Sequence, residues 1–262
     1  MLLAGEGSRL RPYTNDLPKC LVPLDGEALL ERQLKLFKSS GITDIHLVTG
    51  YQQEKLAAQG YPTYLNADYG QSNMVYSLYC AMEILRTAES VVISYGDILY
   101  DATVLEKVLA STSPVSVVAD KEWASYWRAR MEDVAEDAES FITSPEGTIL
   151  ELGGTIETIE SVEAQYIGLV KFEKEGLTRL VEVLTYLFET DPVRYEASKN
   201  MCFTDLLQSL IDQGVAIHPV YIEGSWLEID TVEDYERLVG SGYSREKSVQ
   251  KNREQLIKKY GE

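Results

Sequence analysis

Residues 1–24 constrain this chain more than any other stretch, because they join a glycine-rich turn to a group of positive charges. The turn, Gly5-Glu6-Gly7-Ser8, follows an apolar segment of strand type. Glycine adopts positive φ and has no Cβ, so the backbone N–H groups of such a turn can approach a phosphate closely. Three cations lie in the same loop or just after it: Arg9, Arg11 and Lys19. This order predicts a phosphate-binding loop that follows a buried strand.

The loop differs from two other phosphate-binding motifs. It lacks the Gly-Lys-Ser/Thr ending of a P-loop, and no third glycine stands where a dinucleotide fingerprint needs one. Instead, Ser-Arg-Leu-Arg-Pro follows the two glycines, and Pro18-Lys19 arrives after a short polar spacer. The combined pattern, GxGxRLxPxT followed by PKxLxPL, resembles the signature of the sugar-phosphate nucleotidyltransferases and their cytidylyltransferase relatives. The alternative is a surface loop whose cations are merely solvated.

The resemblance implies roles for several residues of the loop. In that family the loop wraps the triphosphate of a nucleotide, an arginine stabilises the charge that develops on the attacked phosphorus, and a lysine holds two phosphates together. Arg9 and Lys19 take these catalytic positions here. The segment Gly50-Tyr51-Gln52-Gln53-Glu54 also resembles the family's GY(K/Q)xE segment. The nucleotide-binding residues implied by the two segments are Leu3, Ala4, Gly5, Gly7, Ser8, Arg9 and Tyr51.

Residues 72–81 predict a helix that starts beside the nucleotide. Ser72 and Asn73 stand at the N-cap position, and a helix N-terminus favours nearby anionic or carbonyl groups. The order Asn73-x-x-x-Ser77-Leu is similar to the version found in bacterial phosphocholine cytidylyltransferases and in relatives that activate small phosphorylated alcohols or phosphonates. We therefore include Ser72, Asn73 and Ser77 among the nucleotide-binding residues. Simple helix capping is the alternative, and both interpretations can hold together.

Two carboxylates predict a metal site. Asp97 follows Gly96 at the end of a strongly β-prone run, and ligands of open α/β sheets collect at the carboxyl ends of strands. Residues 225–235 resemble the closing motif of the family, in which the acid before a threonine is the second carboxylate on the metal. The resemblance assigns Asp97 and Asp230 to Mg²⁺, which prefers anionic oxygen ligands, and Gly96 to the nucleotide. A capping box of the following helix is the alternative, but it leaves the acid at position 230 unexplained.

The part of the chain that would bind the acceptor is less clearly marked. Two tryptophans share one face of a predicted helix, where they either pack on the sheet or, with nearby carboxylates, hold a small organic cation. The Glu-Lys-Pro element whose lysine grips a sugar phosphate in sugar-nucleotide enzymes is missing, which counts against a hexose 1-phosphate. Residues 164–172 match the family's strand with an inner glycine. The candidate acceptor-binding residues are Trp123, Trp127, Arg130, Glu139, Gly168, Lys171 and Glu228.

Composition limits the partners of the chain. A net charge of −18 repels nucleic-acid backbones, so we expect no nucleic-acid partner. The three cysteines are far apart and lack metal-type spacing, so we expect free thiols. No apolar run approaches the roughly 18 residues of a membrane span, and the N-terminus does not resemble a signal peptide. We therefore expect a cytoplasmic protein.

A chain of 262 residues is long enough for one large α/β domain. The resemblance implies a Rossmann-like three-layer sandwich with a mixed, mostly parallel central sheet. Runs at 148–152, 155–159 and 164–172 predict a β-rich insertion. Residues 1–4 alone precede the glycine turn, whereas a central strand usually runs about five or six residues, so we expect a truncated first strand.

We expect this single nucleotidyltransferase domain to cover residues 1–262. Residues 1–119 form its nucleotide-binding half and residues 120–235 its acceptor-binding half. Residues 236–262 form a helical tail on the surface, which is a candidate homodimer contact.

These patterns lead to one hypothesis and two alternatives. The hypothesis is a cytidylyltransferase that uses CTP and Mg²⁺, transfers CMP to a small phosphorylated amine or alcohol or to a phosphonate, and releases pyrophosphate. Such an acceptor is already anionic at neutral pH, so the absence of an evident catalytic His or Cys is no obstacle. The alternatives are a UTP- or dTTP-dependent sugar-1-phosphate nucleotidyltransferase and a catalytically inactive nucleotide-binding regulatory module.

Overall fold

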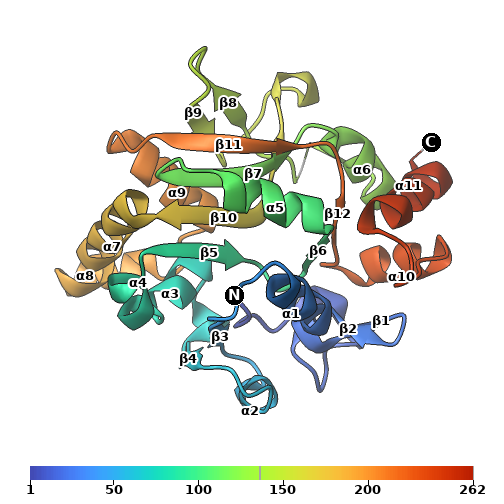
Figure 1. Ribbon diagram of the computed structural model, residues 1–262, viewed down its shortest axis with the longest axis horizontal. Helices are drawn as coiled ribbons and strands as arrows, with labels where there is room; N and C mark the ends of the chain where they lie inside the picture. The colour runs from blue at the N-terminus through green and yellow to red at the C-terminus, as the bar shows by residue number, and fades with distance from the viewer. Residues whose placement is uncertain (136, 262) are drawn as a thin grey trace.

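A mixed sheet runs through the centre of the computed structural model, which describes residues 1–135 and 137–261 (Figure 1). Four strands form its main part in the order β11 (Ile217–Ile222), β7 (Val115–Asp120), β10 (Gln165–Glu173) and β5 (Ser90–Ser94). β11 pairs with β7 in parallel, whereas β10 is antiparallel to both of its neighbours.

The N-terminal residues continue this sheet to a second pair of strands, β3 (Leu47–Thr49) and β4 (Thr63–Leu65). Leu2 forms parallel bridges to Val48 on one side and Tyr95 on the other. Its backbone N–H donates to Ser94 O at 3.0 Å. The expected first strand is thus reduced to a bridge, and β10 is the one strand of the extended sheet that runs against the rest. The predicted mixed, mostly parallel sheet is confirmed.

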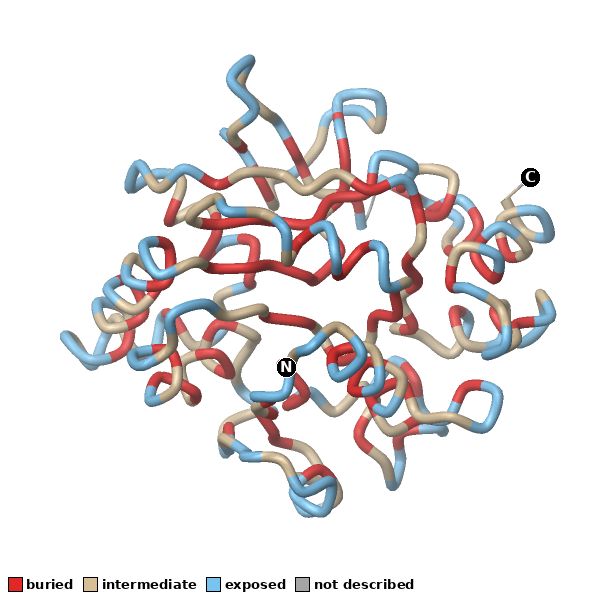
Figure 2. The backbone as a smooth tube through the Cα atoms, viewed as in Figure 1, coloured by how far each residue is buried: buried red, intermediate tan, exposed pale blue. Residues whose placement is uncertain are grey.

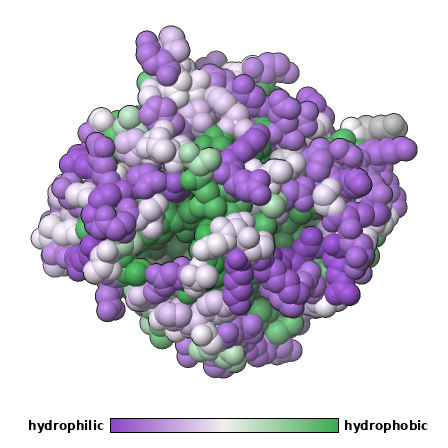
Figure 3. All heavy atoms as spheres, viewed as in Figure 1, coloured by the Kyte–Doolittle hydropathy of each residue, from purple (hydrophilic) through white to green (hydrophobic). Residues whose placement is uncertain are grey.

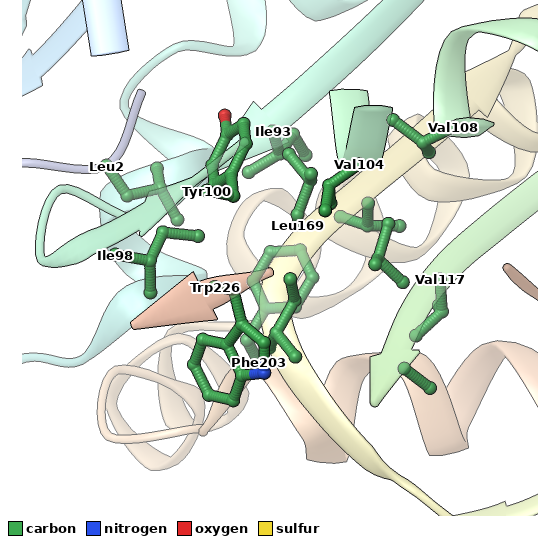
Figure 4. Packing of buried hydrophobic residues seen from close by; sticks show 14 of the residues in the cluster. Leu2, Ile93, Ile98, Tyr100, Val104, Val108, Val117, Leu169, Phe203 and Trp226 are labelled. Carbon is green, nitrogen blue, oxygen red and sulfur yellow. The ribbon is translucent and has the colours of Figure 1, made fainter. Parts of the chain in front are cut away.

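Burial explains which segments occupy the centre of the sheet. β7 (Val-Ser-Val-Val-Ala-Asp) is buried at all of its positions, and β10 at nearly all (Figure 2). A strand covered on both faces reads as a near-continuous apolar run, as these two do. Side chains of the two strands pack with side chains of distant segments, as Val117 of β7, Leu169 of β10 and Phe203 do (Figure 4).

Helices cover both faces of the sheet and give the three predicted layers. α5 (Ala102–Ala110) packs on β7, β10 and β11 and lies in front of the sheet in Figure 1. α9 (Phe203–Asp212) lies behind it. α7 (Lys174–Glu189) packs on β5 and β10 through Leu177, Leu180 and Leu184, which share one face at helical spacing.

The remaining elements are shorter. The other helices are α1 (Leu29–Ser39), α2 (Gln53–Ala57), α3 (Met74–Tyr79), α4 (Met82–Thr87), α6 (Trp123–Arg130), α8 (Pro192–Ser198), α10 (Val232–Gly240) and α11 (Val249–Tyr260). The other strands are β1 (Pro23–Leu24), β2 (Glu27–Ala28), β6 (Ile98–Tyr100), β8 (Phe141–Thr143), β9 (Ile149–Leu152) and β12 (Trp226–Glu228). β12 pairs with β6, and this pairing carries the closing segment of the chain to the loop after β5.

Two expectations about the second half of the chain need correction. The predicted β-rich insertion is a single hairpin, β8–β9, because residues 155–159 form no strand and residues 165–173 belong to the central sheet as β10. The tail is no free surface helix: α11 packs on α6 and β12, and Arg253 on it is 1% exposed and pairs with Asp120. The face of α11 that carries Val249, Arg253 and Leu256 is buried within the chain.

An apolar groove of about 260 Å³ lies beside β5, with side chains of α1 and α4 along it. Figure 3 shows apolar residues gathered in a hollow on this face of the molecule. Among the described residues, no helix is both long enough and apolar enough to cross a membrane.

Candidate active site

A cavity of about 270 Å³ lies where β5 ends and the N-terminal loop begins. The glycine loop, the helix α3, the turn after β5 and the turn after β12 meet there, together with Lys19 and Cys20. Its lining residues are Leu2, Leu3, Ala4, Gly5, Gly7, Ser8, Arg9, Lys19, Cys20, Met74, Ser77, Tyr95, Gly96, Asp97 and Asp230. The structure therefore brings together both predicted catalytic residues, both predicted metal ligands and most of the predicted nucleotide-binding residues.

Gly7 gives the loop its shape. Its φ is +62°, in the left-handed region, and a Cβ at this position would lie 2.9 Å from the Cβ of Lys19. The Thr14 hydroxyl donates to the carbonyl of Gly7 at 2.7 Å and fixes the turn from the other side. Any other residue would be strained here and would push the lysine away. The glycine thus lets Lys19 lie against the loop.

Lys19 joins the two carboxylates. Its Nζ lies 2.7 Å from Asp97 Oδ2 and 2.5 Å from Asp230 Oδ1. The second oxygen of Asp230 lies 2.5 Å from the guanidinium of Arg9. The Arg9 side chain is 69% exposed, whereas the Lys19 side chain is 13% exposed. Two acids that are distant in sequence therefore meet at the N-terminal loop, with one buried and one exposed cation.

Carboxylates outnumber cations in the interior of this centre. Burial lowers the pKa of Lys19, but the charges of Asp97 and Asp230 outweigh that effect and hold the pKa above its ordinary value. Burial raises the pKa of Glu228 to about 7; Arg130 opposes this shift, and the charges of Asp97 and Asp230 add to it. The negative charge of these acids favours the approach of a further positive charge.

The donor set fits a divalent metal ion. Asp97 Oδ1 is buried and has no hydrogen-bond partner in the described part of the chain. No group of three or more His, Cys, Asp or Glu side chains is arranged as a metal site within residues 1–135 and 137–261. Two carboxylates are nevertheless enough for Mg²⁺, which usually keeps waters and takes substrate phosphates as its other ligands. Asp97 and Asp230 are the residues that could hold it.

Asn66, which was not predicted, hydrogen-bonds to Ser77 in the lining of this cavity. It is 1% exposed, and its side-chain amide donates to the hydroxyls of Ser72 and Ser77, each at 2.9 Å. Ser77 lines the cavity, whereas Ser72 and Asn73 do not. Asn73 caps α3 by accepting a hydrogen bond from Met74 N. The signal that could have revealed Asn66 is its place directly after β4, at the carboxyl end of a strand, as with Asp97.

Tyr51 supports the loop and does not line the cavity. Its hydroxyl donates to the carbonyls of Asn15 at 2.6 Å and Thr14 at 3.2 Å. Four lining residues were not predicted: Leu2, Cys20, Met74 and Tyr95. Burial raises the pKa of the Cys20 thiol to about 12, so this cysteine behaves as an apolar wall of the cavity.

The two predicted aromatic ligands of an organic cation are core residues. Trp123 is 2% exposed and Trp127 is 4% exposed. Their rings lie 5.9 Å apart, and Trp127 also contacts the ring of Trp226 at 5.7 Å. Such edge-to-face and tilted contacts are typical of a packed aromatic cluster. Of the two interpretations left open, packing is the one that the structure supports.

A second cavity, of about 680 Å³, shares Arg9 and Asp230 with the first. Its lining is strongly acidic and consists of Arg9, Arg130, Met131, Glu132, Asp133, Asp137, Glu228, Asp230, Thr231 and Asp234. Two predicted acceptor residues, Arg130 and Glu228, are therefore beside the centre. They are also paired with each other, with Arg130 Nη1 at 2.6 Å from Glu228 Oε2.

The three other predicted acceptor residues do not line either cavity. Glu139 accepts a hydrogen bond from Thr204 at 3.3 Å, and burial raises its pKa. A Cβ on Gly168 would lie 2.5 Å from the ring of Tyr95, so this glycine accommodates an aromatic side chain of the protein itself. Lys171 donates to two backbone carbonyls and forms an ion pair with Glu173 on β10. Its ammonium group is therefore already occupied within the protein. These placements argue against direct contact of Gly168 and Lys171 with an acceptor.

Comparison with known proteins agrees with this geometry. Residues 1–229 match the MobA-like NTP transferase domain family. A CTP:phosphoglutamine cytidylyltransferase from Campylobacter jejuni is 33% identical over 245 residues, which cover 90% of this chain and 96% of that protein. A choline-phosphate cytidylyltransferase from Streptococcus pneumoniae is 38% identical over 104 residues, which cover 38% of this chain and 44% of that protein.

The fold also matches solved structures. The structure of CTP:phosphocholine cytidylyltransferase from Streptococcus pneumoniae aligns with a TM-score of 0.66 at 20% identity, over 92% of this chain and 97% of that chain. At this identity the likeness shows the fold alone. It confirms the predicted Rossmann-like α/β architecture.

Proposed function

Because the chain belongs to the MobA-like NTP transferase family and is a nucleotidyltransferase, we propose that it transfers CMP from CTP to a small phosphorylated acceptor. The observation that carries this proposal is the convergence of Lys19, Asp97 and Asp230 on the glycine loop in one cavity. A phosphate or phosphonate oxygen of the acceptor attacks the α-phosphorus of CTP. The bond from that phosphorus to the bridging oxygen breaks, and pyrophosphate leaves.

The residues of the cavity supply alignment and charge for this reaction. The backbone N–H groups of Gly5 to Ser8 bind phosphate oxygens of the nucleotide, as a glycine turn allows. Arg9 and Lys19 stabilise the negative charge that grows on the transferred phosphoryl group and on the departing pyrophosphate. Since the attacking oxygen is already ionised at neutral pH, the protein needs no general base and acts mainly by holding the reactants in line.

Mg²⁺ is the cofactor that we propose for this centre, with Asp97 and Asp230 as its protein ligands. When bound, it supplies Lewis-acid stabilisation of the phosphate oxygens. The unpartnered Oδ1 of Asp97 supports this assignment. Lys19 keeps the two carboxylates beside each other, because its ammonium group contacts both of them.

We propose CTP as the donor because the two curated relatives described above are both named as cytidylyltransferases. The acceptor that we favour is a phosphorylated amide or amine, since the relative aligned over most of the chain is named for phosphoglutamine. The acidic cavity beside Arg9 and Asp230 is open to such a group. In this proposal residues 1–119 hold the nucleotide, and residues 120–235 contribute the wall that faces the acceptor.

A pyrophosphate-release assay tests the proposal. The protein is incubated with Mg²⁺, one of CTP, UTP or dTTP, and a panel of phosphoglutamine, phosphocholine, 2-aminoethylphosphonate and glucose 1-phosphate. We expect release with CTP and one of the first three acceptors. Release that requires glucose 1-phosphate with UTP or dTTP would show a sugar-nucleotide enzyme instead. A thermal-shift series with the same nucleotides gives an independent measure, because a ligand of the native state raises Tm.

A further inference from the structure

Arg130 and Asp234 form a buried pair next to the proposed centre. Arg130 Nε lies 2.9 Å from Asp234 Oδ1, and its Nη2 lies 3.0 Å from Asp234 Oδ2. The exposed fractions of the two side chains are 5% and 4%. A bidentate guanidinium–carboxylate contact of this kind fixes the direction of both groups. The pair is therefore a rigid element that joins the end of α6 to the start of α10.

The same aspartate holds the backbone on which a proposed metal ligand stands. Asp234 Oδ2 accepts hydrogen bonds from the backbone N–H groups of Asp230 and Thr231, both at 3.0 Å. A capping box between Thr231 and Asp234 explains the second of these bonds but not the bond to Asp230 N. Arg130 also donates to Glu228, on the other side of Asp230 in the chain. The guanidinium of Arg130 thus contacts residues on both sides of Asp230 in the turn.

We infer that Arg130 is a positioning residue for nucleotidyl transfer: through Asp234 and Glu228 it sets the backbone of the turn that presents the Asp230 carboxylate to Lys19 and Arg9. This inference rests on the proposed function, and it extends the function to a residue that contacts neither phosphate nor metal. The path is continuous, from Arg130 to Asp234, then to the backbone of Asp230, and from its carboxylate to Lys19 at 2.5 Å.

The contacts of Arg130 explain why it does not serve as a cation for the acceptor. Nε, Nη1 and Nη2 all donate to carboxylates of the protein. The guanidinium carbon also lies 5.2 Å from the ring centre of Tyr126 and 5.3 Å from that of Trp127. An acceptor phosphate would have to break contacts that hold the turn. Arg130 lines the acidic cavity because it supports the turn that forms the cavity wall.

The test compares substitutions of Arg130 with a matched control. Arg130→Met removes the guanidinium, and Arg130→Lys keeps the charge but loses the two-pronged contact. Arg253→Met is the control, because Arg253 is also buried and paired, with Asp120, but has no bond to residues 228–234. The readouts are kcat and KM for CTP and for the acceptor in the pyrophosphate assay, together with Tm. A further readout is amide hydrogen exchange in the peptide 226–235, which needs no turnover.

We expect both Arg130 variants to lower kcat by about 10- to 100-fold, as loss of support for a metal ligand does in other enzymes, with KM for the acceptor unchanged. The amides of Asp230 and Thr231 should exchange faster in both. Arg253→Met should lower Tm while it keeps kcat and the slow exchange of the amides of Asp230 and Thr231. A variant Asp234→Asn, which keeps the shape of the side chain, should reproduce the loss if Arg130→Met does not fold.

Three results would overturn the inference. The first is an unchanged kcat in folded Arg130 variants. The second is a rise in acceptor KM with kcat intact, which would mean that Arg130 binds the acceptor directly. The third is equal loss of kcat in Arg253→Met, which would mean general destabilisation. Failure of the proposed function is a separate outcome, since it would appear as an inactive wild-type protein, and the exchange experiment would still decide the role of Arg130.

Discussion

Lys19 offsets the negative charge of two partly buried carboxylates. Asp97 and Asp230 both contact its ammonium group, and Asp230 receives Arg9 as well. Two carboxylates this close would otherwise repel each other. The lysine therefore lets both carboxylates lie side by side at the N-terminal loop.

Removing either negative charge should abolish most of the activity. We expect Asp97→Asn or Asp230→Asn to lower kcat by about 10²- to 10³-fold or more, because each asparagine keeps the shape but loses a charged ligand. Pyrophosphate release measures the loss, and thermal unfolding shows whether the fold survives. The metal assignment would be wrong if either variant turned over at the wild-type rate.

The cysteines should differ in reactivity as their burial differs. Burial raises the pKa of the Cys20 thiol to about 12, so this thiol stays protonated at pH 8. Because the shift is upward, the thiol stays protonated at every pH below that value. Cys202 is exposed. We expect a thiol reagent at pH 8 to modify Cys202 first and to leave Cys20 intact, as peptide mass mapping would show. Rapid labelling of Cys20 in the native protein would contradict its burial.

α6 shows how one helix can look like a ligand site and serve as part of the core. It buries Trp123 and Trp127 in an aromatic cluster, and it also carries Arg130 to the closing turn. Packing of the tryptophans therefore fixes where the guanidinium lies. α6 therefore contributes to the site by placing Arg130, whereas its aromatic side chains stay buried in the core.

A substitution in this cluster separates packing from binding. Trp123→Ala should lower the free energy of unfolding by about 3–5 kcal/mol, the usual cost of removing a large buried aromatic side chain. Urea unfolding measures this loss. KM for the acceptor should stay the same in the fraction that is folded. A raised KM together with unchanged stability would return the tryptophan to the acceptor site.

A buried ion pair joins the last helix of the molecule to its central sheet. Arg253 of α11 lies 2.6 Å from Asp120 at the end of β7, and the two side chains are 1% and 0% exposed. Asp120 also accepts hydrogen bonds from the indole of Trp226 and the backbone of Gly224. The C-terminal segment is thereby joined to the strand that carries the sheet and to the strand that leads to Asp230.

Loss of this contact should affect stability more than chemistry. We expect Arg253→Met to lower the free energy of unfolding by about 3–5 kcal/mol, because it leaves a buried carboxylate without its charged partner. Urea unfolding at pH 7 measures the change, with kcat per folded molecule as the companion value. A stable variant that loses its turnover would instead place Arg253 in the path to the active site.

Several features of the site could be predicted from the amino-acid order. The glycine turn, Arg9 and Lys19 lie within one short loop, where chain connectivity alone keeps them near one another. Asp97 could be predicted because it follows a strand, and the carboxyl ends of strands share one edge of a sheet. The central sheet could be predicted because buried strands have long apolar runs.

Contacts between distant segments were decided only by the tertiary structure. Trp123 and Lys171 have the residue types of a ligand site. Trp123 instead packs against Trp127, and Lys171 forms an ion pair with Glu173. For Asn66 and Arg130 the opposite holds. Their importance comes from hydrogen bonds to residues that the local sequence pattern does not connect with them. The physical reason is that burial and partnership of a side chain depend on which segments fold against it, whereas periodicity and motif report only on its own segment.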